Sequence, residues 1–187
     1  MTLAPAKALL LTAALLAASV ATAQPLDGQR TLRLHSRDGA SIQIGTVQFR
    51  PQADGRSAFA LSLRPEAFQD FFLSMKEFKC VPAPTEVFCH VPYPYPQPGT
   101  VAPNDLAWLE HALLFMFKTP SEFGAKLWNG VYFQLRPVGN SLVGTPQAVD
   151  LNRISAPPDK PGVPPYRPAL RDDIPPTARW FNRLSID

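Results

Sequence analysis

The first third of the chain alternates apolar and polar residues with the period of two that is typical of β-strands. Three such stretches follow one another, at residues 31–36, 41–50 and 58–63. Asp38-Gly39 and Asp54-Gly55 separate them, and Asp-Gly pairs favour tight turns between antiparallel strands. We therefore predict a three-stranded antiparallel meander. The apolar phase slips across Gly45, which predicts a bulge in the second strand.

Two further hairpins are predicted by the same alternation. One joins residues 76–81 to 86–91, and the other joins residues 131–136 to 142–149. Pro146 restricts the last of these strands to an edge or a bulge, because proline has no N–H to donate. Residues 180–186 also alternate, which predicts a final strand that docks on the sheet.

Helical spacing replaces alternation in three places. Phe68, Phe71 and Phe72 would share one side of a short helix over residues 65–72. The longest helical pattern runs from about Pro103 to Phe117 and is apolar over most of its circumference, so this helix should be packed on more than one side. Residues 119–122 read Thr-Pro-Ser-Glu, which fits a capping box and predicts a second short helix over residues 120–127.

Two segments are too rich in proline for a helix or a central strand. Four of the eight residues from Pro92 to Gly99 are proline, so this segment should run extended. Eight of the 21 residues from Ala156 to Pro176 are proline, and this segment should wrap irregularly over the surface.

These elements predict one α+β domain. A curved antiparallel sheet of about six to eight strands, partly closed, would pack against one main helix. The domain would span residues 24–155, and residues 156–187 would form a proline-rich C-terminal segment that wraps it. The alternative is an all-β sandwich or barrel in which the helix is an insertion.

The first 23 residues have the pattern of a secretory signal peptide. Lys7 precedes an uncharged apolar run from Ala8 to Val20, and Ala21-Thr22-Ala23 supplies the small residues of a cleavage site. A membrane anchor is less favoured, because the run is shorter than the roughly 20 residues that cross a bilayer. We expect cleavage after Ala23 and a periplasmic or secreted protein with no transmembrane segment.

Charge and length narrow the classes of partner. The chain carries 18 Lys and Arg against 15 Asp and Glu, and loss of Lys7 would leave a net charge of +2. Because no cluster of Lys or Arg stands out, we expect no nucleic-acid partner. The 187 residues less the signal suffice for a single domain with its own core.

Two cysteines in an exported chain most simply form one disulfide. A bond between Cys80 and Cys89 would cross the second predicted hairpin and pin its register. The alternatives are a metal site that includes His90, or a reactive thiol. Two cysteines and one histidine fall short of a tetrahedral ligand set, and an exported thiol tends to oxidise. We therefore expect no metal and no other cofactor.

The sequence contains no phosphate-binding glycine loop, no zinc-binding histidine pair and no Gly-x-Ser-x-Gly elbow. Glu110 lies beside His111 on the apolar predicted helix, where it could act as a general base with a raised pKa. The favoured interpretation is a buried carboxylate paired with an arginine such as Arg136.

Three aromatic residues are candidate binding residues. Tyr93 and Tyr95, held in the proline run, could present flat rings to a partner with little loss of entropy. The favoured alternative is that they lie over the sheet and fill a hydrophobic edge. Trp128, in Trp128-Asn129-Gly130, could stack on a ligand, although a turn with a core tryptophan is favoured.

The centre of the chain resembles exported proteins of Gram-negative bacteria that have no assigned function. The matching residues are Phe72-Leu73-Ser74-Met75, Phe78-Lys79-Cys80, Cys89 to Tyr95, Asp105-Leu106, Leu109-Glu110, Phe123-Gly124 and Trp128-Asn129-Gly130. The resemblance covers the central third and implies export, but no activity. We expect a non-catalytic binding or accessory module whose partner is an envelope protein or a small ligand. The alternative is a periplasmic hydrolase-like enzyme with a site at Glu110 and His111.

Overall fold

A computed structural model describes residues 25–70, 79–122 and 124–187. The strands in these residues are β1 (Gly28–Ser36), β2 (Ser41–Pro51), β3 (Ser57–Leu63), β4 (Gln69–Asp70), β5 (Lys79–Pro82), β6 (Val87–His90), β7 (Thr100–Val101), β8 (Phe115–Lys118), β9 (Gly130–Val138), β10 (Ser141–Val149), β11 (Asp172–Asp173) and β12 (Phe181–Ile186). The helices are α1 (Ala107–Ala112) and the 3-10 turns η1 (Pro65–Ala67), η2 (Leu127–Asn129), η3 (Leu151–Ile154) and η4 (Pro168–Leu170).

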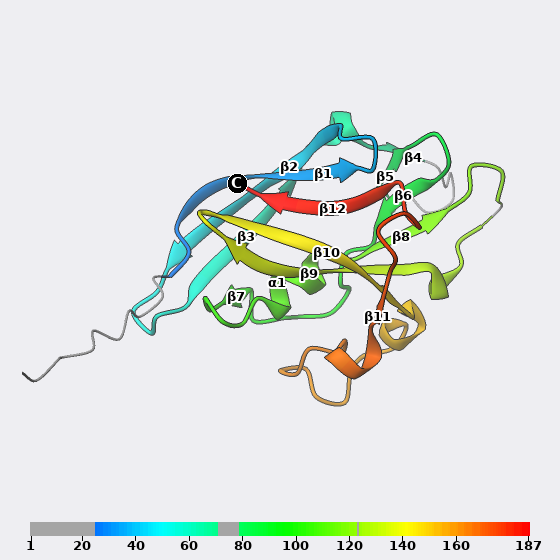
Figure 1. The fold of residues 1–187 in the computed structure, drawn as a ribbon. Coiled ribbons are helices and arrows are strands. Elements are labelled where there is room, and N and C mark those ends of the chain that lie inside the picture. The colour runs from blue at the N-terminus through cyan, green and yellow to red at the C-terminus, as the bar shows by residue number, and fades with distance from the viewer. Residues whose placement is uncertain (1–24, 71–78, 123) are drawn as a thin grey trace, which may run out of the picture.

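The strands form one antiparallel sheet that curls into a half-barrel (Figure 1). Its order is β4-β5-β6-β8-β9-β10-β12-β1-β2-β3-β7, and β11 pairs with β10 beside this path. The predicted curved antiparallel sheet is therefore confirmed, but it has twelve strands rather than the six to eight that we predicted. Within the part of the chain that the structure describes, no helix has the length and apolar character needed to span a membrane.

The N-terminal meander and its bulge are confirmed. β1 and β2 pair with Leu32 opposite Gly45 and Arg33 opposite Gln43, so Ile44 is the extra residue of the bulge. A Cβ atom on Gly45 would lie only 2.3 Å from the Ser62 carbonyl oxygen of β3. The bulge thus requires glycine because the next strand passes too closely for any side chain.

The other two hairpins are confirmed as β5–β6 and β9–β10. On its second edge, β10 pairs with β12 at residues 142–144 and with β11 at residues 147–148. Pro146 falls between these two contacts. The strand therefore accommodates proline at a position where that edge has no ladder.

The predicted C-terminal strand is confirmed as β12, which lies between β10 and β1 in the middle of the sheet (Figure 1). Glu86 fixes where it begins: Oε1 accepts the backbone N–H groups of Trp180 and Phe181 at 2.9 and 3.2 Å. The Arg179 guanidinium lies 3.3 Å from Oε2 of the same carboxylate. Burial raises the pKa of Glu86, and these three partners favour its charged form.

The prediction of one long helix from Pro103 to Phe117 is wrong. The helix α1 covers only Ala107–Ala112, Leu113 leaves helical geometry at φ −111° and ψ 34°, and the chain then enters β8. Residues apolar on all sides suit a strand inside a sheet as well as a buried helix. Pairing of β8 with β6 and β9 decides between them.

The two short predicted helices also differ from the structure. Residues 65–67 form a single turn, η1, before β4, while Phe71 and Phe72 lie outside the described residues. At residues 119–122 the Glu122 carboxylate accepts the Thr119 N–H at 3.2 Å, which is half of the predicted capping box. The following described residues form no α-helix before η2.

The buried side chains form two clusters that meet at α1. Leu109 belongs to the larger cluster, with residues of β1, β2, β9 and β12. Trp108 belongs to the second cluster, with the disulfide, Tyr132 and Tyr166. The helix is short, but it buries Glu110 and His111, and the His111 ring lies among Tyr132, Tyr166 and Trp108 of the second cluster.

Candidate functional site

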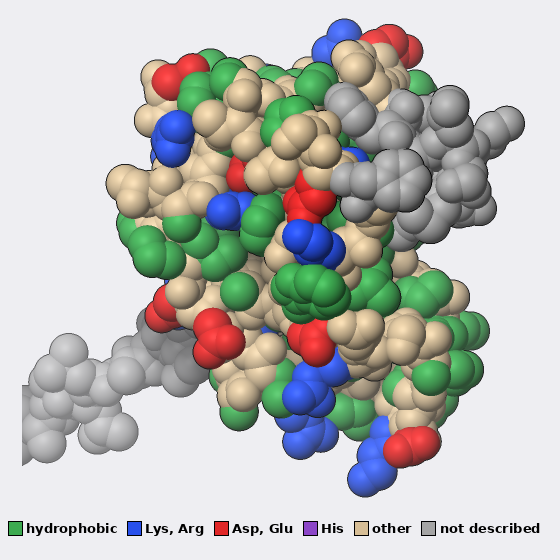
Figure 2. Space-filling model, turned by 90° about the vertical axis from the view of Figure 1, so that its right-hand side faces the viewer, with side chains coloured by type: hydrophobic (Ala, Val, Ile, Leu, Met, Phe, Trp, Pro, Cys, Tyr) green, Lys and Arg blue, Asp and Glu red, His purple; other side chains and the backbone are tan. Residues whose placement is uncertain are grey.

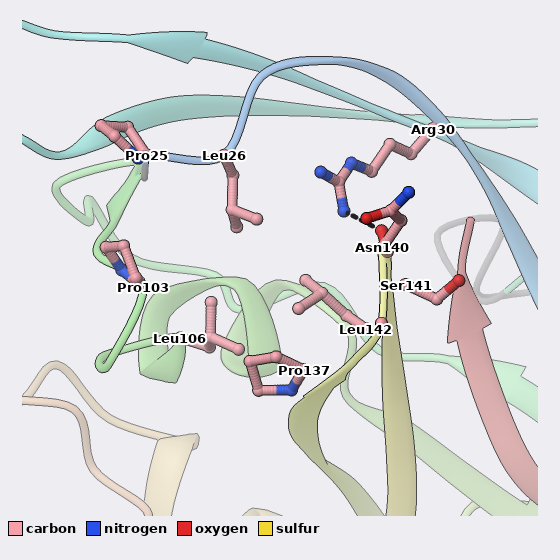
Figure 3. A pocket seen from close by; sticks show the side chains of 10 residues that line it. Pro25, Leu26, Arg30, Pro103, Leu106, Pro137, Asn140, Ser141 and Leu142 are labelled. Carbon is pink, nitrogen blue, oxygen red and sulfur yellow. Dashed lines mark hydrogen bonds between the residues drawn. The ribbon is translucent and has the colours of Figure 1, made fainter. Parts of the chain in front are cut away.

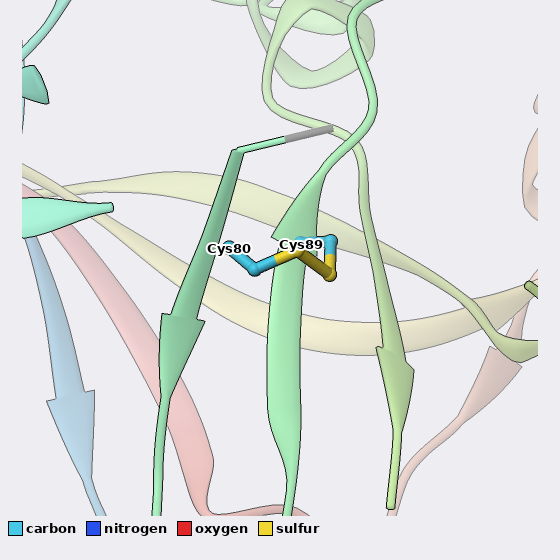
Figure 4. The surroundings of a disulfide bond; sticks show 2 residues. All are labelled: Cys80 and Cys89. Carbon is cyan, nitrogen blue, oxygen red and sulfur yellow. A yellow bond between two sulfur atoms is a disulfide. The ribbon is translucent and has the colours of Figure 1, made fainter. Parts of the chain in front are cut away.

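The predicted disulfide is confirmed between Cys80 and Cys89, which face each other across β5 and β6 (Figure 4). Both residues are fully buried. Because the bond uses both sulfur atoms, neither cysteine can act as a thiol nucleophile or a metal ligand. Among the described residues, no group of three or more His, Cys, Asp or Glu side chains is placed to hold a metal ion.

Glu110 is 7% exposed, and both of its carboxylate oxygens have partners. Oε2 accepts the Tyr132 hydroxyl, and Oε1 accepts the Leu135 N–H at 2.7 Å. Burial raises the pKa of Glu110, and these two hydrogen bonds together with the Arg171 charge act in the opposite direction. The predicted buried carboxylate is therefore correct, but the predicted pairing with Arg136 is wrong, since Arg136 is exposed and donates to Gln134.

His111 is fully buried, and both of its ring nitrogens are used. Nδ1 lies 2.6 Å from the Ala107 carbonyl oxygen, and Nε2 lies 3.1 Å from the Tyr166 backbone nitrogen. A carbonyl only accepts and a backbone N–H only donates, so the ring is the neutral tautomer protonated on Nδ1. Burial lowers its pKa to about 4. The histidine holds two chain segments together and presents no free nitrogen to a substrate.

Arg171 lies in the proline-rich segment, between η4 and β11. Its Cζ atom is 4.5 Å from the centroid of the Tyr132 ring, a cation–π contact that orients the guanidinium. Its Nε atom is buried and has no hydrogen-bond partner among the described residues. Sequence reasoning missed this residue, because nothing in its local pattern distinguishes it from neighbouring surface arginines.

A pocket of about 290 Å³ opens beside these residues, and we call it the Arg171 pocket. Its polar lining comes from Asn104, Asp105, Glu110, Gln134 and Arg171. The N-terminal end of α1 and strand β9 form its walls. The pocket thus brings an oriented guanidinium and a buried carboxyl group to one accessible space.

A second pocket of about 330 Å³ adjoins the first, and we call it the Leu26 pocket. The two pockets share Pro103, Leu106 and Pro137. In Figure 3, Leu26 and Leu106 approach this space from opposite sides. Arg30 also lines it, and its guanidinium donates to the Asn140 carbonyl at 2.8 Å.

The structure places Tyr93 in the core: it is 8% exposed, and its hydroxyl is buried without a hydrogen-bond partner among the described residues. Its ring centroid lies 5.9 Å from Trp108 and 6.0 Å from His111. Burial raises the pKa of Tyr93. Tyr95 is partly buried against the same ring, 5.7 Å away. Tyr93 therefore presents no free ring face to a partner.

Trp128 is 64% exposed on η2, so the favoured interpretation as a core tryptophan is wrong. Its neighbour Leu127 lines an apolar groove of about 340 Å³ with Val91, Pro92, Pro94, Leu151 and Ile154. Figure 2 shows a face with hydrophobic side chains gathered near its centre and charged side chains above and below them. Pro92 and Pro94 of the proline run line this groove.

His35, Ser185 and Asp187 form a hydrogen-bonded chain between β1 and the C-terminus. Arg183 donates to Nδ1 of His35 at 3.1 Å, so Nε2 carries the proton and donates to Ser185 Oγ at 2.8 Å. The Ser185 hydroxyl then donates to Asp187 at 3.0 Å. A nucleophilic serine requires the opposite order, in which the histidine accepts the serine proton. This group therefore does not have the arrangement of a catalytic triad.

No protein-family model, curated protein or solved structure matches the chain. The geometry of the two adjoining pockets is consequently the basis for a functional conclusion.

Proposed function

We propose that this protein is an exported, non-catalytic binding protein of the bacterial envelope, and that it takes a small ligand in the Arg171 pocket. The guanidinium of Arg171 carries this proposal, because Arg171 lines the pocket and the Tyr132 ring holds the guanidinium in place. The volume of about 290 Å³ is close to the lower end of small-molecule sites.

The preset orientation of Arg171 supports binding. The Tyr132 ring lies under the guanidinium, and the Glu110 carboxyl accepts the hydroxyl of that tyrosine. An arginine held in this way loses little conformational freedom when it binds a ligand. The chain of contacts from Glu110 through Tyr132 to Arg171 therefore positions the donor before the ligand arrives.

The alternative of a hydrolase-like enzyme has less support. One of its two site residues, His111, donates to the Ala107 carbonyl and accepts from the Tyr166 N–H, so no nitrogen is free to take a substrate proton. Both oxygens of Glu110 already accept hydrogen bonds. The export part of the proposal is supported by the signal-like N-terminus and by the buried disulfide, which is a feature of oxidising compartments.

A ligand screen with a matched pair of arginine variants tests the proposal. Small carboxylates, amines, sugars and phosphate esters are scored by the rise in melting temperature and then by calorimetry. Binding should be lost in Arg171→Gln and kept in Arg167→Gln, since Arg167 is an exposed arginine in the same segment. Equal binding by both variants would contradict the site. Turnover of an ester or phosphate substrate that disappears in Glu110→Gln would favour the enzyme.

A further inference from the structure

The Arg171 pocket and the Leu26 pocket adjoin each other but differ in chemistry. Carboxyl, amide and guanidinium groups line the first. In the second, Pro25, Leu26, Pro103 and Leu106 lie on one side of the space, and the polar residues Arg30, Asn140 and Ser141 lie on the other (Figure 3). A ligand that spans Leu106 would therefore meet a polar site at one end and an apolar site at the other.

The polar end selects for one negative charge. A guanidinium binds a carboxylate through parallel hydrogen bonds, and Arg171 lines this pocket. Asp105 and Glu110 line the same pocket, so a second negative charge on the ligand would face repulsion. Burial raises the pKa of Glu110, which reduces its repulsion of a single ligand carboxylate.

The apolar end selects for a compact hydrocarbon group. Arg30, the charged residue in this lining, already donates to the Asn140 carbonyl and lies over the Phe49 ring. The leucine and proline side chains gain from contact with a group that removes them from water, at roughly 25 cal/mol for each Å² buried. Against the leucine and proline side chains, a charged or strongly hydrated group would lose its own hydration without compensation.

We infer that the two pockets together bind an amphipathic monocarboxylate, with its carboxylate on Arg171 and its apolar group across Leu106 in the Leu26 pocket. This inference rests on the proposed function, to which it adds the ligand class. The chemistry fits two sources: an aliphatic acid, and the C-terminal carboxylate of a peptide or amino-acid derivative with an apolar side chain.

Four probes separate the possibilities in NMR titrations of the purified protein, with affinities measured by calorimetry. Octanoate represents the aliphatic acid and N-acetyl-leucine the apolar C-terminus. Acetate lacks the apolar group, and octylammonium reverses the charge. Octanoate or N-acetyl-leucine should shift backbone signals around both Arg171 and Leu26, and should bind at least about tenfold more tightly than acetate and octylammonium.

Two variants locate the ends of the ligand. Arg171→Gln should lower the affinity for the tighter-binding of octanoate and N-acetyl-leucine at least about tenfold, whereas Arg167→Gln should leave this affinity unchanged. Leu26→Trp, which fills the apolar pocket, should remove the advantage of that acid over acetate while leaving the acetate-induced shifts at Arg171. A melting temperature close to that of the wild type shows that each variant is folded.

Each result bears on a different claim. Preference for octanoate assigns the aliphatic source, and preference for N-acetyl-leucine assigns the peptide-like source. If neither acid exceeds acetate, or if octylammonium binds as well as octanoate, the inference is overturned. Even when the inference is overturned, the proposed function stands if a polar ligand still shifts the NMR signals at Arg171. The proposed function itself is contradicted if no ligand of the wider screen shifts these signals.

Discussion

Tyr166 donates its backbone N–H to Nε2 of His111, and the two rings stack with their centroids 5.5 Å apart. The contact joins α1 to the proline-rich segment, 55 residues later in the chain. The Tyr166 hydroxyl also donates to the Asp150 carbonyl at 3.0 Å. Since the same segment carries Arg171, neutral His111 helps to fix the arginine at the pocket.

Acid should weaken the fold through His111. Burial lowers its pKa to about 4 from an ordinary value of 6.5, so the unfolded chain takes up this proton first as the pH falls. The loss of unfolding free energy that His111 causes is absent above about pH 6.5 and reaches about 3 kcal/mol at about pH 4. Urea unfolding of the wild type and His111→Gln, followed by tryptophan fluorescence from pH 4 to pH 8, measures the difference between their pH profiles.

The difference between the two pH profiles isolates His111, because the other titrating groups are common to both proteins. His90→Gln is a useful comparison, since His90 is also buried with a lowered pKa but contacts the Ala112 carbonyl. The pH dependence of His111→Gln should be flatter than that of the wild type between pH 4 and pH 6.5. Parallel profiles would show that folding does not lower the pKa of His111.

Removal of the Glu110 side chain should cost more than removal of its charge. Glu110→Ala leaves the Leu135 N–H and the Tyr132 hydroxyl buried without an acceptor, at an expected loss of about 2–4 kcal/mol. Glu110→Gln keeps a polar partner for each group and should lose less than about 1 kcal/mol at pH 7. Chemical denaturation of the two variants makes the comparison, and equal losses would mean that charge is the important property.

The pH dependence of Glu110→Gln gives an independent check. Because burial raises the pKa of Glu110, the folded state holds this proton more tightly than the unfolded chain does. The protonated Glu110 carboxyl group therefore stabilises the folded state at acid pH, and this stabilisation is lost as the pH rises through the raised pKa. Glu110→Gln lacks this titration, so its stability relative to the wild type should increase with pH.

The local patterns predicted those elements whose partners are near in sequence. The turns at Gly39 and Gly55 join strands by short connections, and the disulfide of Cys80 and Cys89 lies within one hairpin. The helix prediction failed for residues 113–117, because a segment that is apolar on all sides can form either a buried helix or a central strand. Phe115–Lys118 form strand β8 because they pair with β6 and β9, which are distant in the sequence.

The candidate site was only partly predictable for a similar reason. Glu110 and His111 stood out by type and by their apolar surroundings in the sequence. Arg171 and Tyr166 did not, because their contacts with α1 and β9 depend on the path of an irregular proline-rich segment. Trp128 is exposed because η2 turns it away from the core, and no hydrophobic periodicity encodes that turn.

Tyr93 should behave as a core residue when it is substituted. Tyr93→Phe removes a buried hydroxyl without a partner among the described residues, so stability should be unchanged or slightly higher. Tyr93→Ala removes a ring packed against Trp108 and His111 and should cost about 3–5 kcal/mol. Melting temperatures provide the measurement, with Trp128→Ala as an exposed aromatic control that should change little. A stable Tyr93→Ala protein would reopen a binding role for this ring.

Deletion of residues 181–187 should prevent folding. The deletion removes β12 from between β10 and β1 and takes the buried residues Phe181, Leu184 and Ile186 out of the core. Each buried side chain of this kind contributes about 1.5–3 kcal/mol, so three of them approach the whole stability of a typical domain. Circular dichroism of the truncated chain should show loss of cooperative thermal unfolding. Asn182→Ala, a substitution of a half-buried residue in the same strand, should keep it.

Gly45→Ala should destabilise the N-terminal meander, whereas Gly162→Ala should not. The new methyl group at position 45 would lie 2.3 Å from the Ser62 carbonyl oxygen, so β2 and β3 would have to separate. Such overpacking costs about 1–3 kcal/mol, and the loss of strand pairing adds to it. At Gly162 the methyl group meets no atom within 4 Å, and reduced freedom of the unfolded chain should raise stability by up to about 1 kcal/mol. Urea midpoints of the two variants should therefore move in opposite directions from that of the wild type. An unchanged midpoint for Gly45→Ala would show that the bulge can shift to admit a side chain.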